Sequence, residues 1–223
     1  SENERNTLVT FNYDTILDEA LASIDQPFDY GIKSENLNGT INQDNGSAKR
    51  CLPLLKLHGS VNWGVNQKDN RVTIYKSYKE LCQSEDLPLL VPPTWRKTFS
   101  GALTDVWEQT LRAISEATRI IIIGFSIPPT DVHFKYLLAA GLRDNISLKR
   151  VYFVNPQKLS MNNLFQTLRK ELYDQDIIRF VDSDTRDYLF NRAALKEINR
   201  IDPSSGLVEG VFGDNEKFWR LGL

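Results

Sequence analysis

Hydrophobic and polar positions change along the chain in blocks that predict short strands separated by helices. Residues 7–11 (TLVTF) are β-branched and apolar, which is typical of a strand, and residues 14–23 repeat apolar positions at helical spacing. Residues 54–57 (LLKL) predict a second, buried strand, and residues 71–75 (RVTIY) predict a hairpin partner for residues 61–65 (VNWGV). The first part of the chain is therefore expected to contain both strands and helices.

The alternation becomes more regular in the second half of the chain. Residues 99–118 have an amphipathic pattern that predicts a long helix, and the all-apolar strand 119–125 (RIIIIGF) is typical of a parallel sheet that is buried on both faces. The remaining pattern predicts helix, strand, helix, strand and helix, in that order, at 131–143, 150–156, 160–173, 176–181 and 184–200. Repeated alternation of this kind predicts an α/β fold, Rossmann-like and doubly wound, with a mostly parallel sheet, helices on both faces and a small insert.

Two segments interrupt the alternation. Residues 34–50 are rich in Asn, Gly and Ser and predict a loop, and residues 90–95 (LVPPTW) are extended because their two prolines disfavour a helix. We expect one main domain over residues 1–200, with the insert at about 64–98 and a tail or linker over 201–223.

Charge and hydropathy exclude several classes of protein. The chain has 27 Lys and Arg against 29 Asp and Glu, so its net charge of −2 gives no electrostatic case for nucleic-acid binding. Its longest apolar run, residues 120–127, is too short to cross a membrane, and its N-terminal segment does not resemble a signal peptide. We therefore expect a cytoplasmic protein without a membrane partner.

The cysteine pattern argues against a structural metal site. Cys51 and Cys82 lie far apart and form no C-x-x-C pair, which excludes a four-cysteine zinc module within this chain. We expect two reduced, half-buried thiols and no zinc.

Small and polar residues stand where the predicted strands end, which is where ligands bind in open α/β sheets. These residues are Asn12 and Asp14, His58 and Gly59, Gly124 and Ser126, and Asn155. Gly124 would let the backbone approach a phosphate or sugar, Ser126 offers a hydroxyl before a helix, and Asn155 can hold a ribose hydroxyl. His58 can exchange a proton at neutral pH because the unperturbed pKa of histidine is about 6.5. The pattern thus favours a nucleotide site with an acid–base group.

At these strand ends the sequence resembles the sirtuin family. Residues 10–14 (TFNYD) look like its Thr-Gln-Asn-Ile-Asp motif, and residues 56–60 (KLHGS) resemble its Leu-His-Gly-Ser catalytic motif. Residues 122–126 (IIGFS) are similar to the strand that ends in Gly-Thr-Ser, and residues 151–156 (VYFVNP) to the strand whose final Asn holds the adenosine ribose. The motifs occur in the family's order.

Two further segments, 92–95 (PPTW) and 124–138, look like the divergent bacterial branch of SIR2-like domains. Domains of that branch often hydrolyse NAD in anti-phage defence proteins. The resemblance thus implies an NAD+ hydrolase that takes NAD as its substrate and cleaves the bond between nicotinamide and ribose.

The resemblance also implies roles for the strand-end residues. His58 would be the base near the nicotinamide ribose, Asn12 would orient that ribose or the attacking water, and Asp14 would lie near the nicotinamide carboxamide. Gly59, beside the base, is expected among the cofactor-binding residues. The adenosine half of NAD would be held by Gly124, Ser126 and Asn155.

Three departures from the family pattern qualify these roles. Phe11 replaces the family's Gln and Tyr13 its Ile, so the nicotinamide pocket is altered. The zinc-binding cysteines of the family are absent between His58 and Gly124. No Gly-Ala-Gly-x-Ser segment, the family's pyrophosphate cradle, precedes residue 10, so the sequence looks like the C-terminal portion of a larger protein or a degenerate domain.

Each motif also has a structural interpretation. His58 could be a structural histidine, Asn12 and Asp14 could form an Asx turn and a helix cap, and the remaining strand ends could be ordinary turns. His133, the second histidine, lies in a predicted helix and is expected to have a packing or capping role.

Three functions remain open at this point: an NAD+ hydrolase, an NAD-dependent protein deacylase, and a non-catalytic regulatory module that binds NAD or ADP-ribose. In each case we expect a homo-oligomer, or a fused or partner domain.

Overall fold

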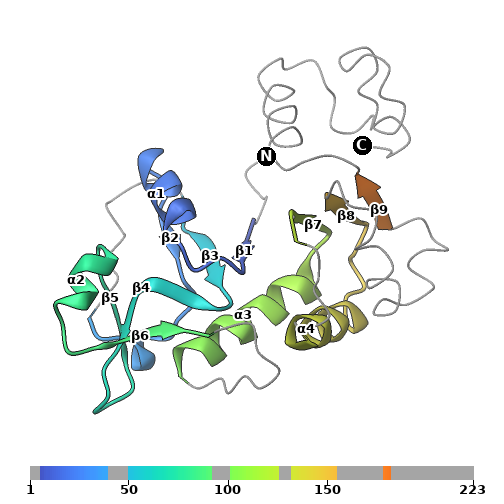
Figure 1. The fold of residues 1–223 in the computed structure, drawn as a ribbon. Coiled ribbons are helices and arrows are strands. Elements are labelled where there is room, and N and C mark those ends of the chain that lie inside the picture. The colour runs from blue at the N-terminus through green and yellow to red at the C-terminus, as the bar shows by residue number, and fades with distance from the viewer. Residues whose placement is uncertain (1–5, 40–49, 92–100, 126–131, 155–177, 182–223) are drawn as a thin grey trace. The chain divides into compact units, whose positions relative to one another are not determined.

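The computed structural model describes residues 6–39, 50–91, 101–125, 132–154 and 178–181 (Figure 1). The chain divides into two compact units. The first consists of Ser1–Ser115 with Thr130–Gly141, and the second of Glu116–Pro129 with Leu142–Leu223.

A small parallel sheet forms the base of the first unit. Its strands are β1 (Leu8–Thr10), β3 (Leu52–Lys56) and β2 (Phe28–Asp29), in the order β1-β3-β2. Both neighbouring pairs are parallel, and Thr10 pairs with Lys56 where β1 and β3 end. Helix α1 (Ile16–Ser23) follows β1, so the predicted strand-to-helix passage over residues 7–23 is confirmed.

An antiparallel module follows directly after β3. Its strands are β4 (Gly59–Val65), β5 (Val72–Ile74) and β6 (Leu87–Leu90), in the order β5-β4-β6. Pairing of β4 with β5 confirms the predicted hairpin. The short helix α2 (Tyr78–Cys82) is capped by Ser77, the residue before it, whose side chain accepts a hydrogen bond from the Glu80 N–H.

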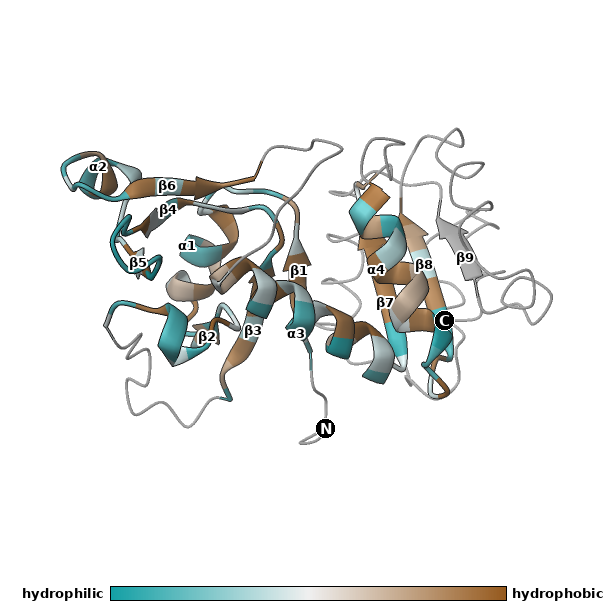
Figure 2. Cartoon of the chain, turned by 90° about the horizontal axis from the view of Figure 1, so that it is seen from below, coloured by the Kyte–Doolittle hydropathy of each residue, from teal (hydrophilic) through white to brown (hydrophobic). Residues whose placement is uncertain are grey.

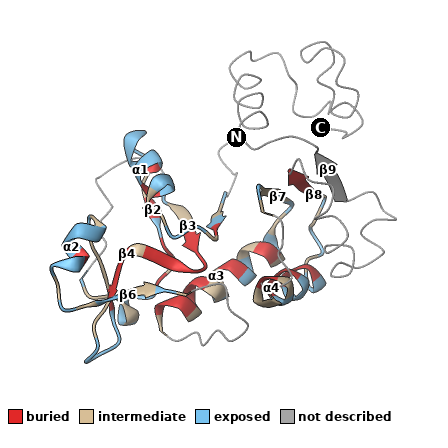
Figure 3. Cartoon of the chain, in the orientation of Figure 1, coloured by how far each residue is buried: buried red, intermediate tan, exposed pale blue. Residues whose placement is uncertain are grey.

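Much of β4 is buried, whereas α1 turns several residues to the surface (Figure 3). The module core contains Trp63, Val72 and Leu81, each almost completely buried. Burial of apolar side chains on one face of a small sheet is the main source of its stability.

Helices α3 (Ala102–Glu116) and α4 (Val132–Arg143) were both predicted by the sequence pattern. They pack closely at Gly141, where an added Cβ would lie 2.5 Å from Cγ2 of Ile114. A glycine permits this approach because it has no side chain. A short 3₁₀ helix, Ser34–Asn36, is tied to α3 because the Asn36 amide donates to the Asp105 carboxylate at 2.6 Å.

The second unit contains a parallel sheet of β7 (Arg119–Ile123), β8 (Arg150–Val154) and β9 (Ile178–Val181), in the order β7-β8-β9. Hydrophobic residues dominate β8, the middle strand (Figure 2). The expectation that the 119–125 strand is buried on both faces was wrong. Among the described strands β7 has β8 as its one sheet neighbour, and Ile121 on β7 is 41% exposed.

The expectation of half-buried thiols was also wrong. Cys51 and Cys82 are both exposed. Cys51 precedes the first residue of β3 and Cys82 is the last residue of α2, so both stand at element ends rather than inside the core.

Several predictions concern residues outside the described ranges: the helices at 160–173 and 184–200, the tail at 201–223, and parts of the 34–50 loop. In the part of the chain that is described, no helix is both long and apolar enough to cross a membrane.

Candidate functional site

The segment after β1 presents two of the predicted site residues. Asn12 is exposed, and its backbone N–H donates to the Thr10 hydroxyl at 3.0 Å. Within the described residues, the Asn12 side-chain amide has no hydrogen-bond partner in the protein. It is therefore available to a ligand.

Asp14 has a local structural role. One of its carboxylate oxygens accepts a hydrogen bond from the N–H of Ile16, the first residue of α1, at 3.1 Å. This is the Asx turn that the sequence suggested. The suggested helix cap at Asp14 was wrong, because the N-cap of α1 is Thr15 and no side-chain cap hydrogen bond forms there. The role is compatible with ligand contact because the carboxylate keeps a second oxygen.

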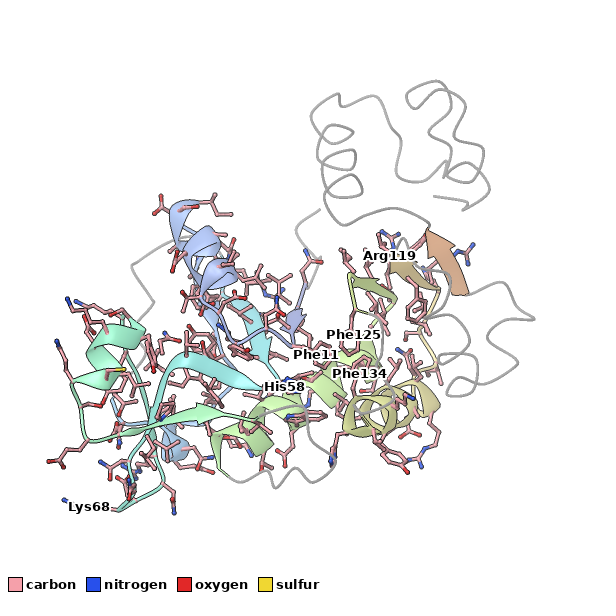
Figure 4. The ribbon with its side chains drawn as sticks, viewed as in Figure 1. Phe11, His58, Lys68, Arg119, Phe125 and Phe134 are labelled. Atoms are coloured by element: carbon pink, nitrogen blue, oxygen red, sulfur yellow. The ribbon has the colours of Figure 1, made fainter. Side chains whose placement is uncertain are left out.

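His58 lies in the tight turn between β3 and β4 and is only 6% exposed. Its ring packs edge-on against Phe11, with centroids 5.6 Å apart, and Phe11 packs in the same way against Phe134 at 4.8 Å (Figure 4). Phe11 is the residue that replaces the glutamine of the sirtuin motif. The departure noted in the sequence thus places an aromatic ring beside the candidate base.

The backbone around His58 is held by three other elements. The Leu57 N–H donates to the Thr10 carbonyl at 3.0 Å, and the Val91 N–H donates to the His58 carbonyl at 3.0 Å. From α3, the Trp107 indole N–H donates to the Leu57 carbonyl at 2.9 Å. These bonds fix the turn before any ligand arrives, which is the preorganisation that an acid–base group needs.

Parallel pairing of β1 with β3 brings the candidate residues of the first unit to one sheet edge. Asn12 and His58 each stand two residues beyond the paired residues Thr10 and Lys56. The carboxyl ends of neighbouring parallel strands meet at the same edge. Asn12 and His58 therefore follow neighbouring strands at the same sheet edge.

Gly59 is explained by the backbone alone. Its φ is +80°, and an added Cβ would lie 2.0 Å from the carbonyl oxygen of Leu89 on β6. No L-residue fits such an approach without moving the strand. The glycine thus lets β4 begin close beside β6 directly after the His58 turn, whether or not it also contacts a ligand.

The remaining candidates belong to the second unit. Gly124 follows β7 with φ +67°, and its N–H donates to the Val154 carbonyl at 2.9 Å. This N–H is therefore already engaged with the neighbouring strand. Ser126 and Asn155 lie outside the described residues.

The second histidine has the packing role that the sequence predicted. The His133 ring lies edge-on to Trp107, with centroids 6.4 Å apart.

Sequence reasoning missed a buried charge pair beneath the site. The Lys56 ammonium contacts the Asp18 carboxylate at 2.8 Å and the carbonyl of Asp14, and the Tyr30 hydroxyl donates to the other oxygen of Asp18. A lysine in a run of leucines was the available signal, because a charge inside a buried strand requires a partner.

The described residues contain no group of three or more His, Cys, Asp or Glu side chains that could hold a metal ion.

Comparison with known proteins identifies the family to which this α/β chain belongs. The SIR2-like domain family model matches residues 6–177. The chain therefore belongs to the SIR2-like domain family, as the four motifs indicated. A search among curated proteins gave no significant match.

Three solved sirtuin structures resemble the chain. One, described as Sir2 with a p53 peptide and NAD+, shares 14% identity with a TM-score of 0.40 and is matched over 66% of this chain. A second, Sir2 with the inhibitor EX-527, 2′-O-acetyl-ADP-ribose and a deacetylated p53 peptide, shares 15% identity with a TM-score of 0.38 over 65% of this chain. A third, from work on sirtuin substrate affinity, shares 15% identity with a TM-score of 0.39 over 65%. The chain spans 56% of each of these three proteins.

Proposed function

We propose that the protein consumes NAD+ and that the reaction is hydrolysis of the bond between nicotinamide and ribose. Membership of the SIR2-like family and the sequence motifs support this assignment. The observation that carries it is the pairing of β1 with β3, which brings the exposed amide of Asn12 and the turn of His58 to one sheet edge.

The chemistry follows from the charge that develops during cleavage. Water attacks C1′ of the ribose while the C1′–N bond breaks, and the bonding electron pair leaves with nicotinamide, which departs neutral. The products are ADP-ribose, nicotinamide and a proton. Because C1′ gains oxocarbenium character, a site that orients the sugar and supplies fixed dipoles lowers the barrier.

Residues of the first unit have different roles in this reaction. Asn12 orients the nicotinamide ribose or the attacking water through its amide, and His58 accepts the proton from that water or from a ribose hydroxyl. A base of this kind typically contributes about 10²–10⁴ in rate. Asp14 and Gly59 line the nicotinamide end of the site.

Gly124, Ser126 and Asn155 are proposed to hold the adenosine half of NAD+, with Gly124 allowing close approach of the backbone. In this proposal residues 1–200 form the NAD-binding domain, with an insert at about 64–98 and a tail or linker over 201–223. We also propose that the protein acts in the cytoplasm and does not need zinc. It would act within a homo-oligomer or together with a fused or partner domain. Its proposed biological role is anti-phage defence in bacteria.

The test is hydrolysis of NAD+ by the full-length protein and its Asn12→Ala variant, with nicotinamide and ADP-ribose measured by chromatography. We expect the variant to lose about 10²-fold in rate, because an unoriented ribose rarely reaches the reactive geometry. Asn6→Ala is the matched control, since Asn6 is exposed and precedes β1. An Asn12→Ala variant as fast as the parent would contradict the assignment.

Nicotinamide release that requires an acylated peptide would identify a deacylase instead. This arm uses the same assay with and without the peptide. We expect release in its absence.

A second function, a non-catalytic module that binds NAD or ADP-ribose, is favoured by one observation. His58 is 6% exposed and packs against Phe11, as a structural histidine would. Calorimetric titration separates the two functions: binding of NAD+ by the full-length protein without turnover would support the binding module.

A further inference from the structure

Lys56 is the last residue of β3 and its side chain is completely buried. Its ammonium donates to Asp18 on α1 at 2.8 Å and to the carbonyl of Asp14. Lys56 therefore connects β3, the strand before His58, both to α1 and to the segment that follows β1.

Tyr30 completes the network. Its hydroxyl donates to the Asp18 oxygen that does not face Lys56. Burial raises the pKa of Tyr30, and the charge and hydrogen bond of Asp18 raise it further. The hydroxyl consequently stays protonated and keeps donating, so both oxygens of Asp18 are held.

The network acts on the backbone that carries Asn12. The Tyr13 carbonyl accepts a hydrogen bond from the Val61 N–H on β4 at 2.8 Å, and the next carbonyl, that of Asp14, accepts from Lys56. Two consecutive carbonyls after Asn12 are thus tied to the two strands on either side of the His58 turn.

Stability alone does not account for such a pair. Removing two charges from water is costly, and an apolar pair of similar volume is often equally stable. A buried charge pair is better explained when it favours one conformation of the surrounding backbone over the alternatives. At Lys56 the selected geometry is that of the segment 12–14.

We propose that Lys56, with Asp18 and Tyr30, is a positioning residue that holds the Asn12 amide in register with the His58 turn. Lys56 itself does not touch the substrate. This inference rests on the proposed function for its effect on rate, but the anchoring of the segment stands on the hydrogen bonds alone.

The test replaces the whole network in the full-length protein. Lys56→Met alone leaves Asp18 buried without its cation and threatens the fold. The triple variant Lys56→Met, Asp18→Leu, Tyr30→Phe removes the two charged side chains and the hydroxyl of the network together. We expect it to melt near the parental temperature while kcat/KM for NAD+ cleavage falls about 10- to 100-fold.

Amide hydrogen exchange gives a readout that does not depend on activity. We expect faster exchange in residues 12–19 of the triple variant than in the parent, because the Asp14 carbonyl loses its anchor. The matched control is Lys68→Met, at an exposed lysine in the turn between β4 and β5 (Figure 4). It should change neither exchange nor rate.

The outcomes separate this inference from the function. If the parent does not cleave NAD+, the proposed function fails, and exchange in residues 12–19 alone decides whether the anchor exists. A stable triple variant whose amide exchange matches that of the parent would overturn the inference. A triple variant that keeps both the stability and the cleavage rate of the parent would overturn it as well. Unfolding of the triple variant would assign the network to stability and also overturn it.

Discussion

At Gly59, beside the candidate base, the backbone geometry determines which residue type fits. With φ at +80° and a hypothetical Cβ 2.0 Å from the Leu89 carbonyl oxygen, alanine is opposed twice, by its backbone conformation and by the neighbouring strand. We predict that Gly59→Ala lowers the free energy of unfolding by about 2 kcal/mol or more. Urea denaturation measures this loss.

Gly39→Ala is the matched control. Gly39 has a similar φ of +87°, but nothing lies within 4 Å of its hypothetical Cβ. Only the conformational penalty of about 1 kcal/mol should appear there. Equal losses in the two variants would contradict the close approach at Gly59.

Tyr30 makes stability depend on alkaline pH. Its pKa is raised in the folded protein, so above the ordinary tyrosine value of about 10 the unfolded chain loses a proton that the folded protein keeps. The unfolding free energy should therefore be unaffected by Tyr30 below that value and fall above it, by about 1.4 kcal/mol per pH unit.

The measurement is urea denaturation between about pH 8 and pH 11, comparing the parent with Tyr30→Phe. The variant is less stable throughout, because it leaves one Asp18 oxygen without its donor, but it should lack the Tyr30 part of the alkaline decline. Parallel profiles for the two proteins would contradict the raised pKa.

At the scale of elements, the antiparallel module is held by apolar packing. Leu81 on α2 is almost completely buried, and its Cδ1 would lie 2.6 Å from a Cβ added at Gly64 on β4. We predict that Leu81→Ala costs about 2–5 kcal/mol of unfolding free energy, through lost contacts and the cavity left behind. Leu87→Ala on β6, at an exposed leucine, is the control and should cost much less.

The same packing predicts that a chelator has no effect on this module. Trp63, Val72 and Leu81 fill its core, and the described residues offer no cluster of metal ligands. Calorimetric melting with and without EDTA should give the same transition temperature. A lower temperature in EDTA would reveal a metal that stabilises the fold.

Elements were more predictable from the sequence than the contacts between them. Apolar periodicity located β1, β3, α3 and α4 because hydrophobic spacing depends only on neighbours along the chain. It did not reveal that Ile121 on β7 is exposed or that β7 has one neighbour among the described strands, because strand order depends on the whole fold.

The same difference applies to the candidate site, where positions along the chain were predictable and contacts between distant residues were not. The strand ends at Asn12 and His58 could be recognised from the sequence, since each follows an apolar run. The partners of Lys56 could not, because Asp18 and Tyr30 lie 38 and 26 positions away along the chain and meet Lys56 only through folding.

For the molecule as a whole, the central claim is that one sheet edge of a SIR2-like domain performs NAD+ cleavage with His58 as its base. The chain offers an internal comparison, because His133 is its only other histidine and packs against Trp107. Removing either ring loses an edge-on aromatic contact, but only His58 stands beside Asn12 at the sheet edge.

The most direct measurement is the initial rate of nicotinamide release from NAD+ by full-length His58→Ala and His133→Ala. The account predicts a fall of about 10²–10⁴ for His58→Ala and a rate close to that of the parent for His133→Ala. Cleavage by His58→Ala at the parental rate, or equal losses in the two variants, would contradict it.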